Sequence, residues 1–293
     1  MAGILQSIIS GLIVGSIYAA MAMGLTLIYG GLRLLNLAQG ALFMIGGYAG
    51  WLVSGQVGLP PLIGMLAAFA IVAIFGMAIQ LLVIRRLIRM PGWEINTIVA
   101  TLGLGILLEN VALAIFGPQN KNQPLLVNGD VRLPYGITVT NMAIASAAIT
   151  IVLLAAMGLF LRQSRHGMAI RAISQHMTAA RLMGINVERT YLLIMAISAG
   201  LAGLAGVMLS AFYYVYPSVG ETYLLKGLII TIFGGLGSVK GTIYAAYIIG
   251  MVEELVSYIW GASWSLPVLF LLIIAVLVVR PAGLFGVPEE ARL

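Results

Sequence analysis

Polar side chains inside the apolar segments of this sequence are its first candidates for chemistry. Glu109 and Asn110 lie far along an apolar run. Thr101 precedes Glu109 by eight residues, so a helix would place the two near one face. An ionisable group inside an apolar span costs about 2.5–3.5 kcal/mol and usually faces water or the interior of a bundle. Glu109 therefore lines a solute pathway, is hydrated near the outer interface, or bonds a neighbouring helix.

Groups that could perform covalent catalysis or hold a metal are scarce. The two histidines, His166 and His176, lack the i, i+4 spacing of a helical metal pair, and the chain has no cysteine. The glycine-rich segment 234–241 lacks the Lys-Ser/Thr ending of a phosphate-binding loop. The sequence therefore predicts no enzyme, no metal site and no cofactor, and any ATP that is used must bind another chain.

The elements that must position the polar groups follow from composition. Of the 293 residues, 61% are apolar and 8% are charged, whereas soluble domains have about 45–50% and 25%. Five stretches carry no charge, and each could cross a hydrocarbon core of about 30 Å: 1–32, 34–84, 133–161, 190–220 and 255–279. Because the alternation of a membrane β-barrel is missing, we predict an all-α polytopic transmembrane bundle.

Hydropathy and helix breakers divide the chain into eight spans and a ninth, shorter segment. The eight predicted spans are 4–28, 37–57, 62–84, 95–116, 139–161, 190–212, 241–260 and 264–279. The ninth segment, 224–236, is bounded by Lys226 and by a glycine cluster. It either crosses the membrane or re-enters on the same side.

Basic residues indicate the orientation of these spans. The net charge is +6, but the Arg and Lys side chains lie in short loops between apolar runs, which favours orientation signals over a nucleic-acid surface. Clusters follow the third, fifth and last of the eight spans: Arg85, Arg86 and Arg89; Arg162, Arg165, Arg171, Arg181 and Arg189; Arg280 and Arg292. The positive-inside rule then predicts nine spans with the N-terminus outside. Eight spans with a re-entrant segment are the alternative.

Small and polar residues indicate how the helices meet. Asn36 and Gln39 flank the break between the first two spans, and Asn36 is suited to cap the second helix. Glu253 and Glu254 are adjacent, so they point in different directions and need not form a carboxylate pair. Glycines at helical spacing predict close backbone packing: Gly11 and Gly15, Gly46 and Gly50, and Gly200, Gly203 and Gly206.

The largest polar segment is the loop 162–189. Residues 168–184 within it are predicted to form one helix, which Gly184 would end as a left-handed cap. The small side chains of Ala179 and Ala180 would let a partner approach closely. From the residues alone, this helix either lies on anionic headgroups or docks onto a cytoplasmic protein.

The same loop carries a recognisable pattern. The run Thr178-Ala179-Ala180-Arg181-Leu182-Met183-Gly184 resembles the EAA-x-x-x-G loop of ABC-importer permeases, with Thr178 in place of glutamate. Four blocks are similar to branched-chain amino-acid permeases of the LivH type: GLTLIYGGLRLLNLAQGALFMIGGYAG, SRHGMAIRAISQHMTAARLMGINVERT, LKGLIITIFGGLGSVKGTIYAAYIIGMVEE and RPAGLFG. The resemblance covers residues 11–286. It departs at Gln39, where the family usually has histidine, and at Glu109, where it often has glutamine.

The resemblance implies a single permease domain over residues 1–293, with an ATPase-coupling loop at about 162–189, in the cytoplasmic (inner) membrane of a bacterium or archaeon. The implied partners are two cytoplasmic ABC ATPases, a second similar permease and an extracytoplasmic solute-binding protein. The expected function is import of branched-chain or other small hydrophobic amino acids, or related amides. Candidates for the substrate pathway are Asn36, Gln39, Thr101, Glu109 and Asn110. Candidates for ATPase coupling are Arg171, Gln175, Thr178, Ala179, Ala180, Arg181 and Gly184.

Two other transport classes are compatible with the residues when the resemblance is set aside. One is a secondary transporter that uses Glu109 for proton or sodium coupling, and the other is a passive channel for a small neutral solute. Uptake that survives removal of the ATPases but collapses with the proton gradient would favour the secondary transporter.

Overall fold

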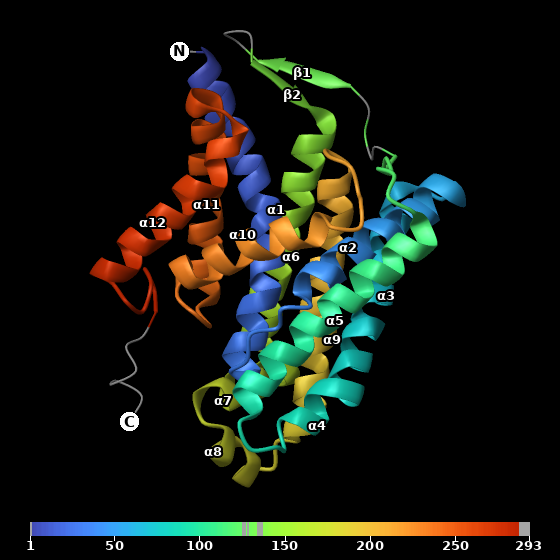
Figure 1. The fold of residues 1–293 in the computed structure, drawn as a ribbon. Coiled ribbons are helices and arrows are strands. Elements are labelled where there is room, and N and C mark those ends of the chain that lie inside the picture. Colours follow the sequence, from blue (N-terminus) through green and yellow to red (C-terminus); the bar gives the residue numbers. More distant parts are fainter. Residues whose placement is uncertain (1, 125–126, 128, 134–136, 287–293) are drawn as a thin grey trace.

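The computed structural model describes residues 2–124, 127, 129–133 and 137–286, and it shows a bundle of long helices (Figure 1). The α-helices are α1 (Ala2–Leu32), α2 (Gln39–Gly50), α3 (Pro61–Ile79), α4 (Arg85–Leu87), α5 (Trp93–Phe116), α6 (Asn141–Gln163), α7 (Arg165–Gln175), α8 (Met177–Leu182), α9 (Val187–Ser210), α10 (Val219–Gly234), α11 (Val239–Trp260) and α12 (Ser265–Val279). Two π-helical segments and one 3₁₀ turn accompany them: η1 (Trp51–Gln56), η2 (Gln80–Ile84) and η4 (Ala262–Trp264). The strands are β1 (Asp130–Leu133) and β2 (Ile137–Thr140).

Seven helices in the described part of the chain are long and apolar enough to cross a membrane, and the predicted helical bundle is confirmed. The remaining predicted spans are shorter: α2 continues into η1, and α10 has 16 residues and lies crosswise to α1 near the middle of the bundle (Figure 1). The count of nine spans therefore stays a prediction. The placement of Lys226 at the edge of a span is wrong, because α10 begins at Val219 and Lys226 lies inside it.

Short polar side chains define the starts of four helices. Each accepts a hydrogen bond from the backbone N–H three residues later, which satisfies a donor that the helix leaves unpaired. These cap residues are Thr140 before α6, Ser164 before α7, Asn186 before α9 and Ser238 before α11. The local sequence therefore determines where the chain turns between helices.

Helices α1 and α9 have the most buried surfaces of the spans and form the centre of the bundle. Helix α1 packs along α11, and α9 packs against α2 and α3. Glycines bring these backbones into contact: Gly46 of α2 faces the backbone of Gly203, and Gly206 faces the backbone oxygen of Phe43. Gly11 and Gly15 contact the backbone of α11 in the same way. The close packing predicted from glycine spacing is confirmed at these positions.

We expect Gly206→Ala to lower the free energy of unfolding by about 1–3 kcal/mol, because an added methyl group would overlap the backbone oxygen of Phe43 and force α2 from α9. Gly103→Ala is the matched control, since no atom lies within 4 Å of its Cβ position. Thermal unfolding of the purified variants measures the difference. Equal unfolding midpoints for the two variants would contradict the close approach of α2 and α9.

The two ends of the bundle differ in structure and charge. The hairpin of β1 and β2 lies at the end where α1 begins, and the side chain of Gln6 exchanges two hydrogen bonds with the backbone of Thr138, at 3.0 and 3.1 Å. Helices α4, α7 and α8 lie at the opposite end (Figure 1). The first two basic clusters therefore share one end, as the predicted orientation requires. Arg292, of the third cluster, lies outside the described residues.

Candidate functional site

A hollow of about 190 Å³ opens between α2, α5 and α10. Helix α10 reaches α2 because Gly40 and Gly220 face each other without an intervening side chain. The lining consists of Leu37, Gly40, Ala41, Leu102, Gly105, Ile106, Glu109, Pro217, Gly220, Glu221 and Leu224. Two carboxylates therefore share a mostly apolar hollow, Glu109 from α5 and Glu221 from the first turn of α10.

The break between α1 and α2 forms part of this lining. The hydroxyl oxygen of Thr101 accepts a hydrogen bond from the backbone N–H of Leu37 at 3.2 Å, which ties the break to α5. The side-chain oxygen of Asn36 accepts from the backbone N–H of Ala38 at 3.2 Å. The prediction that Asn36 caps α2 is wrong in detail, because Ala38 occupies the cap position and Asn36 stabilises the turn before it.

Gln39 and Asn110 lie away from the hollow. The Gln39 side chain is fully buried, and its Nε2 donates to the backbone oxygen and the hydroxyl of Ser198, at 3.1 and 3.2 Å. Because the Ser198 hydroxyl donates to the backbone oxygen of Gly24, this cluster joins α1, α2 and α9. Asn110 is exposed on α5 and donates to the backbone oxygen of Ile106. Of the five pathway candidates, Glu109 lines the hollow. Asn36 and Thr101 bond the backbone of the break beside it.

A buried charge cluster was not predicted. Lys226 of α10 donates to Glu253 of α11 at 2.6 Å and to the Tyr18 hydroxyl at 2.9 Å, and the two charged side chains are 10% and 12% exposed. The ammonium group also lies 5.3 and 5.0 Å from the ring centres of Tyr18 and Tyr223. Glu254 lines a different hollow, with Gln6 and Tyr213, so the expectation that the two adjacent glutamates point apart is confirmed.

The predicted single helix over 168–184 is wrong. The chain forms α7 and α8 with a break at His176, whose backbone is extended and whose Nδ1 accepts a hydrogen bond from the backbone N–H of Ala179 at 3.1 Å. His176 therefore caps α8, a role that the sequence analysis did not predict. The cap at Gly184 is confirmed, since its φ of +83° lies in the left-handed region and its N–H donates to the backbone oxygen of Arg181.

The coupling candidates point in several directions. Ala180 is 4% exposed and packs with Ile173 and Val187, so it belongs to the internal contact of the helical pair. Gln175, Thr178, Ala179 and Gly184 are exposed, and Arg171 donates to the backbone oxygen of Arg162. The apolar residues Leu182 and Met183, at the end of α8, are 83% and 84% exposed. We call this pair the α8 tip. Helix α8 lies at the extremity of the molecule, beyond α7 (Figure 1).

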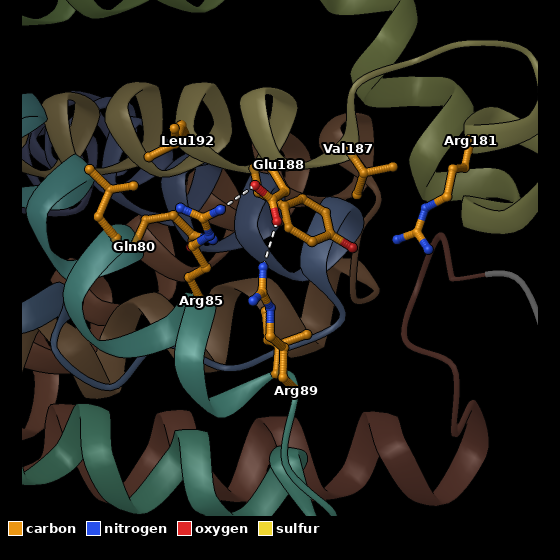
Figure 2. Close-up of a pocket in the computed structure, with 10 residues that line it drawn as sticks. Gln80, Arg85, Arg89, Arg181, Val187, Glu188 and Leu192 are labelled. Atoms are coloured by element: carbon orange, nitrogen blue, oxygen red, sulfur yellow. Dashed lines mark hydrogen bonds and ion pairs between the residues drawn. The ribbon is translucent and has the colours of Figure 1, made fainter.

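The side chain of Arg181 lines a second hollow, of about 140 Å³ (Figure 2). On the other side of this hollow, Glu188 of α9 accepts hydrogen bonds from Arg85 at 2.7 Å and from Arg89 at 2.8 Å. All four side chains lie at the end of the bundle that carries the first two basic clusters. Arg181 therefore belongs to a basic hollow between α4, α8 and α9.

A bundle of apolar helices, interrupted near its middle by short helices beside a polar hollow, is the architecture of a polytopic membrane permease. Residues 7–277 match the family described as branched-chain amino acid transport system / permease component. The chain belongs to this family. It is therefore a transport permease of the inner membrane and not an enzyme, and it works with ABC ATPase partners.

Several permeases are similar in sequence to nearly the whole chain. The high-affinity branched-chain amino acid permease LivH of Escherichia coli K12 is 30% identical over 99% of this chain and 97% of its own length. BraD of Pseudomonas aeruginosa is 31% identical over 99% and 98%, and a probable LivH of Methanocaldococcus jannaschii is 28% identical over 96% and 93%. The solved structure of PsaBC from Streptococcus pneumoniae in complex with Fab aligns with a TM-score of 0.45 and 15% identity, over 97% of this chain and 92% of that one.

Proposed function

We propose that this permease imports branched-chain or other small hydrophobic amino acids, or related amides, along the face formed by α2, α5 and α10. The observation that carries the proposal is the pair of carboxylates, Glu109 and Glu221, in one hollow. A carboxylate that faces lipid costs several kcal/mol, so such a face belongs against water or another protein. The substrate class follows the names of the relatives, and the rest of the hollow fits it.

The chemistry of the hollow matches a small amino acid. Glu109 and Glu221 supply negative charge for an ammonium group, while Leu102, Ile106 and Leu224 supply apolar contact for a hydrocarbon side chain. Gly40 and Gly220 face each other, and Gly105 faces the backbone of Leu37 and Ala38, so the three helices meet closely around these side chains. The open side of this face is where we place the second permease, so that the pathway runs between the two chains.

The exposed α8 tip supports docking onto an ATPase. Leu182 and Met183 end α8, and α8 lies at the end of the molecule farthest from β1 and β2 (Figure 1). Exposed apolar side chains in such a place are suited to insert into a groove of a partner. We propose that two ATPases bind the tips of two permeases and that an extracytoplasmic solute-binding protein docks at the hairpin end.

Replacing Glu109 tests the pathway. We expect Glu109→Gln to slow ATP-driven uptake about tenfold at normal membrane levels, because the amide keeps the size of the side chain but loses the charge that favours an ammonium group. A barrier raised by about 1.4 kcal/mol has this effect. Glu94→Gln, at the start of the same helix and outside the hollow, is the control. Unchanged uptake in Glu109→Gln and Glu221→Gln would contradict the proposed pathway.

A further inference from the structure

The basic hollow between α4, α8 and α9 lies where one membrane-capable helix ends and another begins. Arg85 lies within two residues of Leu87, where one membrane-capable helix ends, and Glu188 is the second residue of another. The arginines are on the side that the positive-inside rule assigns to the cytoplasm. The hollow therefore opens where a lipid of the cytoplasmic leaflet would present its phosphate group.

The charges in the hollow do not balance. Arg85, Arg89 and Arg181 line it together with a single carboxylate, Glu188, so the described lining carries a net charge of about +2. Each carboxylate oxygen of Glu188 takes one guanidinium nitrogen, from Arg85 and Arg89, which leaves most of their donors free. Arg181 faces the pair from α8 and has no ion-pair partner among the described residues (Figure 2). An anion with several acceptor oxygens would complete this arrangement.

The remaining lining is mostly apolar, and part of it lies on a membrane-capable helix. Leu81, Ile88, Val187 and Leu192 form most of the wall, together with Gln80 and Tyr191, and Leu81 lies in η2 within the span. Gln80 beside it is 3% exposed, and its side-chain oxygen has no hydrogen-bond partner. An acidic side chain of an ATPase would account for the arginines but not for an apolar wall that runs up a transmembrane helix. A lipid accounts for both, with its phosphate group at the arginines and its acyl chain along the wall.

We propose that this hollow is a binding site for an anionic phospholipid of the cytoplasmic leaflet. The phosphate group lies between Arg89 and Arg181 and accepts their free donors. The lipid thereby bridges the turn after α4, at the end of one span, to α8 of the ATPase-coupling loop. Basic pockets between transmembrane helices on the cytoplasmic side are a known setting for such headgroups.

The test is the binding of phosphatidylglycerol to the delipidated complex of permease and ATPases in detergent, measured by native mass spectrometry, with phosphatidylcholine as the neutral comparison. We expect wild type to prefer phosphatidylglycerol, and the Arg89→Gln and Arg181→Gln variants to lose about fivefold in affinity each. Arg86→Gln is the matched control, because Arg86 is exposed on α4 but does not line the hollow. Glu188→Gln removes the competing carboxylate and is expected to tighten binding.

Three results would overturn the proposal. One is equal binding of the two lipids, or binding that the arginine variants leave unchanged. Another is free glycerol phosphate competing as strongly as the lipid, which would indicate a site for soluble phosphates. The third is loss of the ATPase from the Arg89→Gln and Arg181→Gln variants with unchanged lipid binding, which would assign the arginines to a protein contact.

Discussion

Replacing Lys226 with methionine is expected to lower the free energy of unfolding by about 3–5 kcal/mol and to deplete the permease from the membrane. The substitution leaves the buried carboxylate of Glu253 without its cation, and removal of one partner from a buried ion pair typically costs this much. The second carboxylate oxygen of Glu253 has no hydrogen-bond partner, and Lys226 is the cation paired with this carboxylate among the described residues. The measurements are the membrane level and the thermal unfolding of the purified protein.

The double variant Lys226→Met with Glu253→Met separates the ion pair from simple packing. Two apolar side chains of similar volume need no partner, so most of the lost stability is expected to return. Lys240→Met, at an exposed lysine near the start of α11, should behave as wild type. If the double variant were less stable than Lys226→Met alone, the cluster with Tyr18 and Tyr223 would owe its stability to something other than charge compensation.

Replacing the α8 tip is expected to abolish ATP-driven uptake while leaving the permease folded. Burial of a Leu or Met side chain contributes about 1.5–3 kcal/mol, so Leu182→Ser combined with Met183→Ser should weaken ATPase binding by more than about 100-fold. The two side chains are mostly exposed within this chain, so their loss should leave its unfolding midpoint unchanged. Co-purification of the ATPase and uptake in proteoliposomes measure the effect.

The control for the α8 tip is Met168→Ser, which changes an exposed methionine of α7 and should keep the ATPase bound. ATPase that remains bound to the Leu182→Ser, Met183→Ser variant would refute docking at the tip. If that variant instead lost affinity for vesicles while keeping the ATPase, the tip would be a lipid contact.

The helical bundle could be predicted because the sequence contains charge-free runs that are long enough to cross a lipid bilayer as helices. A helix satisfies its own backbone, so apolar length alone predicts most spans. Glycine packing and the cap at Gly184 were predictable for the same reason, since each depends on the glycine itself and its close neighbours. The position of Glu109 beside a hollow follows from its helix, which faces α2 and α10 over this length.

The features that the sequence did not reveal depend on distant partners. Lys226 appeared to end a span, because its partner Glu253 lies 27 residues away on another helix. Glu221 was missed because the segment was predicted to begin at residue 224, whereas α10 begins at Val219. The break at His176 depends on one side-chain bond that competes with a continuous helix. The hairpin consists of four-residue strands, too short for an alternating pattern to be read.

Water accessibility along α5 in the assembled transporter tests the central claim most directly. The chain has no cysteine, so single cysteines report cleanly. Ile106 and Leu107 are adjacent and 56% and 57% exposed, but only Ile106 lines the hollow. A polar maleimide should therefore modify Ile106→Cys and leave Leu107→Cys largely unmodified, and substrate delivered by the binding protein with ATP should protect the former. Equal modification of the two variants, or no protection, would contradict a substrate pathway along α2, α5 and α10.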